Sequence, residues 1–202
     1  TGVSNIAVGT DSMDSNTDGN YNVAVGADAL QANSTGHRNV AIGHTALNDN
    51  TVSDNIGIGQ QAGYSITTGT RNIAIGTNAL DDTDTENDNL AIGYNAMTTN
   101  TAGGVQNVAI GNYAGDALTS GDDNVAVGYG AATSLDTGDH NTIVGKGGAQ
   151  SLTSGDSNSM FGRATGYNIT SASKNVLIGN EAGYANTDGY ENTFVGYQRS
   201  EE

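Results

Sequence analysis

The pentapeptide Asn72-Ile73-Ala74-Ile75-Gly76 is one copy of a motif that returns along the whole chain: Asn, Val or Ile, Ala, Val or Ile, then Gly. Twelve copies or close variants occur, and the step between them is 17 residues in nine cases, 16 in one and 18 in one. Self-similarity at a short fixed period is typical of a solenoid, in which each repeat forms one coil. The copies begin at Asn5, Asn22, Asn39, Asn55, Asn72, Asn89, Asn107, Asn124, Asn141, Asn158, Asn175 and Asn192.

The composition favours one repeat-built rod over residues 1–202, with no second domain. Aromatic residues make up 5% of the chain, Gly numbers 30, and Trp and Pro are absent, which leaves too little bulk for a conventional core. Low hydrophobicity with a net charge of −16 is typical of disorder, but strict apolar columns argue against it. The absence of Cys excludes a disulfide scaffold.

The charge balance excludes two classes of partner. Six Lys and Arg residues stand against 22 Asp and Glu residues, so nucleic acid and anionic membrane surfaces would be repelled. The sequence has no apolar run of about 18 residues, so we expect no membrane insertion by this segment.

Within a coil, the residues after the Asn alternate as in a β-strand. In Val23-Ala24-Val25 the two branched side chains share one face and Ala24 takes the other. We expect the branched face to fill the inside of the coil and the Ala face to press on a neighbouring surface. The following Gly permits a turn. An apolar pair such as Ala29-Leu30 or Ala46-Leu47 then predicts a second short strand.

The recurring Asn predicts a ladder of side-chain amides, each bonded to its neighbours in adjacent coils. A single coil buries too few apolar side chains to offset its conformational entropy, so stacking is compulsory. The Ala face left over points to burial between chains, and we expect a homo-oligomer. The residues assigned to the ladder are Asn22, Asn39, Asn55, Asn72, Asn89, Asn107 and Asn124.

The motif Asn-x-Ala-(Ile/Val)-Gly-x-x-Ala resembles the head repeats of YadA-type trimeric autotransporter adhesins, with a loop about three residues longer. It is also similar to the repeats of bacteriophage tail fibres. The likeness covers Asn5 to Gly196. It implies a left-handed parallel β-roll in which three chains pack into a rod on a cell or virion surface.

Three late repeats depart from the pattern: Thr142-Ile143-Val144, Ser159-Met160-Phe161 and Thr193-Phe194-Val195. Their first position is polar and their Ala position is large. If the Ala column lines the contact between chains, these layers hold the chains further apart or change to another packing, such as a neck or cap.

Two sets of residues are candidates for binding. Tyrosines at two repeat positions could stack on sugar faces of a surface glycan or contact a host receptor, or could simply cover loop backbone. An acidic loop could hold Ca²⁺, although no calcium motif is present; no other cofactor is expected. The tyrosines are Tyr64, Tyr167 and Tyr184 at one position and Tyr94, Tyr129 and Tyr197 at the other; the acidic residues are Asp81, Asp82, Asp84, Glu86 and Asp88.

No catalytic constellation is apparent, because Cys is absent and His37, His44 and His140 occupy different repeat positions. The sequence therefore predicts a non-enzymatic, extracellular adhesin or tail-fibre segment that spaces or presents a binding face. A pure spacer is one alternative. Ice binding is another, but Thr drifts between repeat positions, as at Thr17, Thr35, Thr51, Thr68, Thr101 and Thr137.

Overall fold

The computed structural model describes residues 2–99 and 103–199, and these form one parallel sheet of twelve three-residue strands in sequence order. No helix occurs in the described ranges, and so none that could cross a membrane. The predicted all-β solenoid is confirmed, whereas its left hand and the number of chains stay predictions. The strands are β1 (Ile6–Val8), β2 (Val23–Val25), β3 (Val40–Ile42), β4 (Ile56–Ile58), β5 (Ile73–Ile75), β6 (Leu90–Ile92), β7 (Val108–Ile110), β8 (Val125–Val127), β9 (Thr142–Val144), β10 (Ser159–Phe161), β11 (Val176–Ile178) and β12 (Thr193–Val195).

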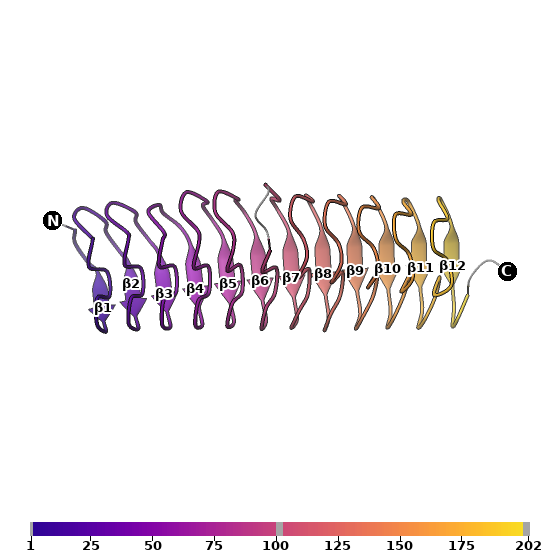
Figure 1. Ribbon diagram of the computed structural model, residues 1–202, viewed down its shortest axis with the longest axis horizontal. Helices are drawn as coiled ribbons and strands as arrows, with labels where there is room; N and C mark the ends of the chain where they lie inside the picture. Colours follow the sequence, from indigo (N-terminus) through magenta and orange to yellow (C-terminus); the bar gives the residue numbers. More distant parts are fainter. Residues whose placement is uncertain (1, 100–102, 200–202) are drawn as a thin grey trace.

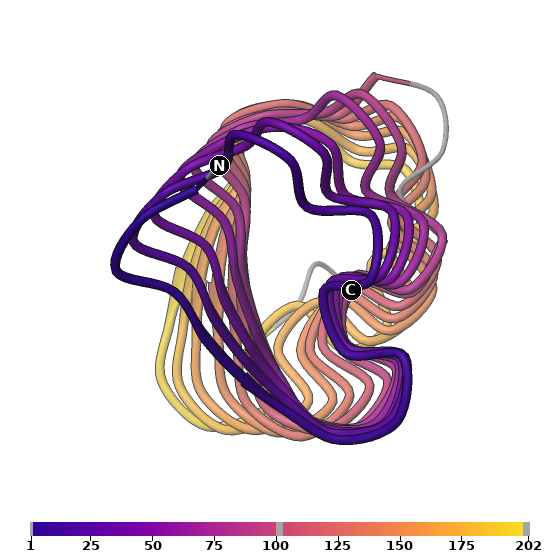
Figure 2. The ribbon, with the colours of Figure 1, turned by 90° about the vertical axis from the view of Figure 1, so that its left-hand side faces the viewer.

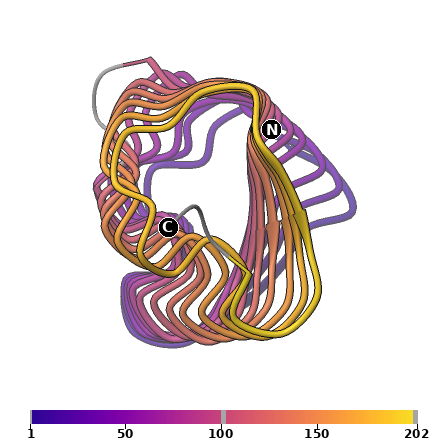
Figure 3. The ribbon, with the colours of Figure 1, turned by 90° about the vertical axis from the view of Figure 1, so that its right-hand side faces the viewer.

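The coils stack into a straight rod with one strand per coil (Figure 1). Seen along the rod, each coil is a loop with one nearly straight wall, and successive coils are slightly rotated (Figure 2 and Figure 3). Neighbouring strands pair in strict register, so that Ile73 lies beside Leu90 and Ala74 beside Ala91. Each repeat position therefore forms a column along the rod.

The Gly after each strand allows the coils to approach at the corner of the wall. Gly76 has a φ of 132°, and a Cβ on it would lie 2.3 Å from the carbonyl oxygen of Gly93 in the next coil. Any larger residue would therefore push two coils apart at this corner.

The prediction of which strand face points inward was wrong. Ala24 and Ala74 are fully buried inside the coil, whereas Ile73 and Ile75 beside Ala74 lie on the outer surface and are half-buried. The reason is space, because in these coils Leu30 or Leu80 fills the interior from the opposite side and leaves room for only a small residue from the strand. The Ala column is buried within its own chain and leaves the branched columns outside.

The predicted second strand was also wrong. In the segment around Ala79-Leu80, every second residue has a left-handed backbone conformation, with φ of 55° at Asn78 and 50° at Leu80. Asn78 N–H donates to the Gln60 carbonyl of the preceding coil at 3.0 Å, and Leu80 N–H donates to the Ala96 carbonyl of the next coil at 3.1 Å. The segment thus keeps hydrogen bonds in both directions without the extended conformation of a strand.

The buried Asn column joins each coil to the next through the backbone. The Oδ1 atom of Asn72 accepts the N–H of Asn89 at 3.0 Å, and its Nδ2 donates to the carbonyl of Glu86 at 2.7 Å. Asn72 N–H in turn donates to Oδ1 of Asn55 at 2.9 Å. The predicted ladder is therefore confirmed in the wider sense that each Asn bonds the adjacent coils. Direct amide-to-amide bonds appear only later, as from Asn158 to Asn141 at 2.9 Å.

The wall opposite the sheet places its one large buried side chain at either of two repeat positions, three residues apart. Leu80 fills its coil beside the small Thr83, whereas Ile66 fills the preceding coil beside Gly63. A Cβ on Gly63 would lie 2.9 Å from Cδ1 of Ile66 and 2.8 Å from Cδ2 of Leu47. The interior thus tolerates one long aliphatic side chain from this wall at each level.

The large central residues of the late repeats point into their coils and not toward another chain. Ile143, Met160 and Leu177 are fully buried inside their coils. Gly166 makes room for Met160 and Leu177, because a Cβ there would lie 2.8 Å from the Met160 sulfur and 3.1 Å from Cδ1 of Leu177. The interpretation as a neck or cap rested on an outward Ala column and is withdrawn with it.

We expect Asn72→Ala to destabilise the chain by about 2 kcal/mol or more, because the N–H of Asn89 and the carbonyl of Glu86 both lose their buried partner. Urea unfolding followed by circular dichroism would measure the change. The control is Thr68→Ala, which removes a hydroxyl at an exposed turn. Equal effects of the two substitutions would contradict the role of the buried column.

The exchange of large residues predicts compensation between Gly63 and Ile66. Gly63→Leu overfills its coil, at about 1–3 kcal/mol, and Ile66→Asn empties it, at about 2–5 kcal/mol. The double variant reproduces the Leu30 and Asn33 pair of the second coil. We expect its unfolding free energy to recover at least half of the summed losses. Strictly additive losses in urea unfolding would show that the two positions do not share one space.

Candidate functional site

Two of the predicted tyrosines meet on adjacent coils. The rings of Tyr167 and Tyr184 lie 5.1 Å apart between centroids, with 15° between their planes. Such an offset parallel pair is favoured by the ring quadrupoles and leaves part of each face uncovered. Tyr184 is 41% exposed. The predicted position therefore yields a small aromatic platform near the C-terminal end of the described chain.

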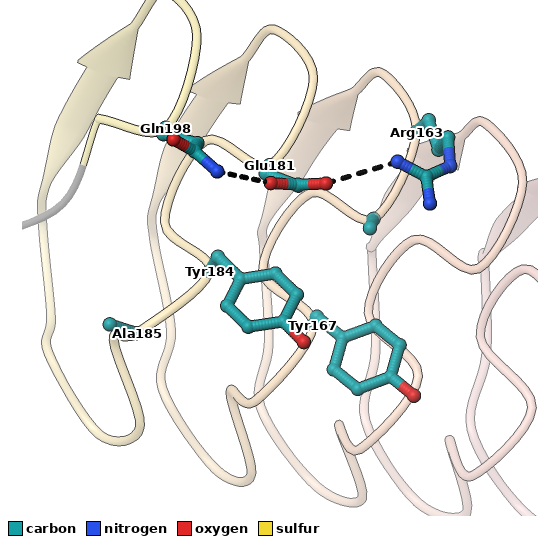
Figure 4. Close-up of a pocket in the computed structure, with 7 residues that line it drawn as sticks. Arg163, Tyr167, Glu181, Tyr184, Ala185 and Gln198 are labelled. Atoms are coloured by element: carbon teal, nitrogen blue, oxygen red, sulfur yellow. Dashed lines mark hydrogen bonds and ion pairs between the residues drawn. The ribbon is translucent and has the colours of Figure 1, made fainter.

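A polar row runs beside this platform and encloses a groove of about 620 Å³ with it (Figure 4). Arg163 Nη1 lies 3.0 Å from a carboxylate oxygen of Glu181, and Gln198 Nε2 donates to the other oxygen at 2.7 Å. These bonds, first from Gln198 and then from Arg163, lower the pKa of Glu181. The groove therefore has an aromatic wall and a wall of donors and acceptors.

The second tyrosine position forms a longer ladder with a member that the repeat pattern did not reveal. Tyr113 stands between Tyr94 and Tyr129, edge to face with both, at centroid distances of 5.5 and 5.8 Å. The ammonium of Lys146 lies 5.5 Å from the Tyr129 centroid. Tyr113 was missed because it follows its Asn by one residue more than its neighbours do. Desolvation first, and then Tyr94, raises its pKa.

Two of the predicted tyrosines join neither group. Tyr197 follows β12 and is 65% exposed. Tyr64 is half-buried, and in the adjacent coils Asn48 and Asp81 occupy its repeat position. Its setting fits the simpler interpretation that the ring covers the backbone next to Gly63.

The carboxylates of the acidic loop, residues 81–88, bond to different partners and do not converge on one point. Glu86 is buried and accepts the N–H groups of Asp84 and Thr85 at 2.9 and 2.8 Å, so it closes its own turn. Asp88 accepts two bonds from Arg71 at 2.6 and 2.7 Å. Within the described ranges no group of three or more His, Cys, Asp or Glu could hold a metal ion. The positions predicted for Ca²⁺ were Asp81, Asp82, Asp84, Glu86 and Asp88.

The column just before the Asn carries charges that alternate in sign. Arg38 binds Asp54 through two bonds of 2.6 and 2.8 Å, and Arg71 binds Asp88 in the same way one pair further along. The hydrogen bonds from the guanidinium groups lower the pKa of both carboxyls. Each exposed pair contributes little stability, but the alternation favours the observed register over a slipped one.

The histidines have separate local partners. His37 Nδ1 accepts the backbone N–H of Asn20 at 2.9 Å, and His140 Nε2 lies 3.6 Å from the Asp123 carboxylate. His44 Nε2 lies 4.0 Å from the carboxylate of Asp28. That the chain is not an enzyme stays a prediction.

Threonines form a more regular column than the sequence interpretation recognised. Thr51, Thr153 and Thr170 hold the same repeat position, and each hydroxyl donates to a carbonyl in the next coil, at 2.8, 3.0 and 3.3 Å. The hydroxyls that an ice surface would need are therefore engaged along the rod. Thr101, which was among the threonines considered, lies outside the described residues.

Comparisons of the chain with protein-family models, with curated proteins and with solved structures found no match. The resemblance to adhesin heads and tail fibres therefore stays a prediction.

Asp81 predicts a pH dependence of stability. Burial first, and then repulsion from Asp82, raises the pKa of Asp81 from 3.8 to about 6. Asp81 thus binds its proton more tightly in the folded chain than in the unfolded chain, so its contribution to stability is fully present below the unfolded pKa and is lost as pH rises through about 6. Asp81→Asn should remove this fall and raise stability at pH 7. Urea unfolding between pH 4 and 8 measures it; the control Asp188→Asn, at an exposed site, should keep the slope of the unsubstituted chain.

Proposed function

We propose that this chain is a non-enzymatic segment of an extracellular adhesin or tail fibre, assembled from three copies into a rod that spaces or presents a binding face. The observation that carries the proposal is the outer face of the sheet. The third residue of every strand forms an apolar column along the whole rod, in which Ile42, Phe161 and Ile178 are about 40% exposed, at 39, 42 and 42%. The first residue forms a second column beside it, apolar except at Thr142, Ser159 and Thr193. None of the twelve strands contains a charged residue. A contiguous apolar face of this length is typical of an interface.

A further copy of the same chain fits this face better than an unrelated partner does. The side chains recur at the strand spacing of about 4.8 Å, and only another rod of the same period can contact every level. The rest of the surface is acidic, with a net charge of −16 for the chain, so two copies repel each other except across the uncharged sheet. The contact is therefore a sheet-to-sheet one.

The two columns also suggest how three chains would close. One column runs through Ile73 and Leu90 and the other through Ile75 and Ile92, on the same outward face. If each chain offers one column to each neighbour, the heterologous contacts close into a ring around a threefold axis. A dimer would instead place the same face against itself. The resemblance to trimeric adhesin heads favours three chains.

The architecture also supports the role of a spacer. Twelve coils at about 4.8 Å give a rod roughly 55–60 Å long, and backbone hydrogen bonds join each coil to the next. On a trimer, groups on the outside would recur three times at each level. Weak contacts to a surface would then combine through avidity. Ice binding has no comparable support, because the sheet carries aliphatic residues where regular Thr ranks would be needed.

Ile75→Lys tests the assembly. Ile75 lies on the outer face of β5, so the charge should not disturb the coil but would be desolvated between chains. We expect the unsubstituted chain to sediment as a trimer and Ile75→Lys to sediment as a monomer with an unchanged circular dichroism spectrum. Thr68→Lys, at an exposed turn, is the control and should remain trimeric.

A monomeric unsubstituted chain at micromolar concentration would refute the proposed assembly. A trimer that is indifferent to Ile75→Lys would place the contact elsewhere. Ala74→Arg, by contrast, would insert the charge into the interior of the coil, so it reports on the fold and not on association.

A further inference from the structure

We propose that the groove between the Tyr167–Tyr184 platform and the Arg163–Glu181–Gln198 row is a binding site for a neutral oligosaccharide. The inference rests on the proposed function, since it names the class of ligand that an adhesive rod would bind at this groove. It differs from that function in committing to one groove and to uncharged sugars.

The aromatic wall supplies the apolar contact that a pyranose ring needs. Figure 4 shows both rings nearly face-on beside the polar row, with Ala185 next to Tyr184. Ala164 also lines the groove, so the lining includes two small residues, Ala164 and Ala185. The rings are 5.1 Å apart along the rod, a step close to the length of one sugar unit. The C–H face of a sugar can therefore lie against an aromatic surface that spans two coils.

The polar wall supplies groups that match hydroxyls, which both donate and accept. The bonds of Arg163 to described residues all run through Nη1, to Glu181 and Asn180, so the other N–H groups of its guanidinium remain available. Gln198 uses its Nε2 on Glu181, and its amide oxygen accepts no hydrogen bond from a described residue. Donors and acceptors thus lie along one line opposite the rings.

The charge of the groove selects uncharged ligands. Arg163 and Glu181 compensate each other at 3.0 Å, so the site is locally neutral within a chain of net charge −16. The cation in the preceding coil at the Arg163 position, Lys146, lies over the ring of Tyr129. A sulfated or uronate sugar would meet the acidic surroundings without an uncompensated cation in the groove.

Tyr64 provides a natural control within the same chain. It holds the same repeat position and also follows a Gly, as Tyr167 and Tyr184 do. No ring stacks on it, and the positions of the Arg163 and Glu181 row are taken in its coil by Gln60 and Gln61. If these tyrosines only cover the backbone, replacing Tyr64 or Tyr184 should have the same effect on sugar binding. If the groove is a binding site, only the replacement of Tyr184 should weaken binding.

The test uses the whole chain and a defined panel of linear hexasaccharides of glucose, mannose, galactose and N-acetylglucosamine. Heparin and alginate oligosaccharides form the charged arm. Isothermal titration calorimetry measures binding, because its signal does not depend on the tyrosines that the variants remove. The variants are Tyr184→Ala, Arg163→Gln and the control Tyr64→Ala, each checked for an unchanged thermal unfolding curve. Sedimentation of the same samples reports the assembly.

We expect at least one neutral sugar to bind with little dependence on salt. Tyr184→Ala should weaken its binding by about tenfold, the loss of about 1.4 kcal/mol of contact. Arg163→Gln should also weaken it, and Tyr64→Ala should not. The proposal is overturned if no neutral sugar binds, if only charged ones do, or if Tyr64→Ala has the same effect as Tyr184→Ala. Should Tyr184→Ala fail to fold, Arg163→Gln against Tyr64→Ala decides alone.

The two proposals fail separately. A trimer that binds no neutral sugar would remove the site and leave the fibre assignment in place. A monomer that binds a sugar through Tyr184 would remove the assembly and leave the site.

Discussion

The structure depends on the hydrogen bonds that the buried Asn column makes between coils. Each strand has only three residues, so the ladder of the sheet alone is short. The Asn amide extends it by bonding the backbone of the next coil twice, as Asn72 does with Asn89 and Glu86. Because these amides are buried, losing one leaves polar groups without water to replace it. Each coil is therefore stabilised by its neighbours, and folding is cooperative along the rod.

Limited space inside the coil is the second constraint, and it also shapes the surface. The interior accepts one long side chain from the wall opposite the sheet, and where this stands at the Leu80 position, as in the coils of Leu30, Leu47 and Leu80, the strand residue is Ala. Where the strand carries Ile143 or Met160, the Leu80 position is reduced to Ala149 or Gly166, and the long side chain of the wall comes from Leu152 or Ile169, three residues further on. The branched residues have no room inside and form the outer face. The apolar surface that supports the proposed assembly is thus a consequence of how the core is filled.

The candidate site was predictable in its residue types and repeat positions but not in its contacts. Tyr167 and Tyr184 stack because they occupy the same position in adjacent coils, which the period already placed about one strand spacing apart. Tyr113 was not foreseen, since a one-residue offset along the chain still brings its ring between Tyr94 and Tyr129. The acidic loop shows the reverse case. Its carboxylates are close in sequence, yet Glu86 turns inward to the backbone and Asp88 outward to Arg71.

The amino-acid sequence by itself determined the period, the number of coils, the parallel in-register stacking and the columns, because only a stacked repeat brings like residues together at every level. It could not determine which strand face turns inward. Both faces of Val-Ala-Val are apolar, so the alternating pattern fits either orientation of the strand equally well. Nor could the sequence show whether Ala79 and Leu80 form a β-strand or a backbone in which every second residue is left-handed. Both conformations direct hydrogen bonds toward the two adjacent coils. The tertiary structure decided these points through volume. Where Leu takes the Leu80 position, the closed coil leaves room for only a methyl group from the strand, and the two branched side chains of the strand face outward.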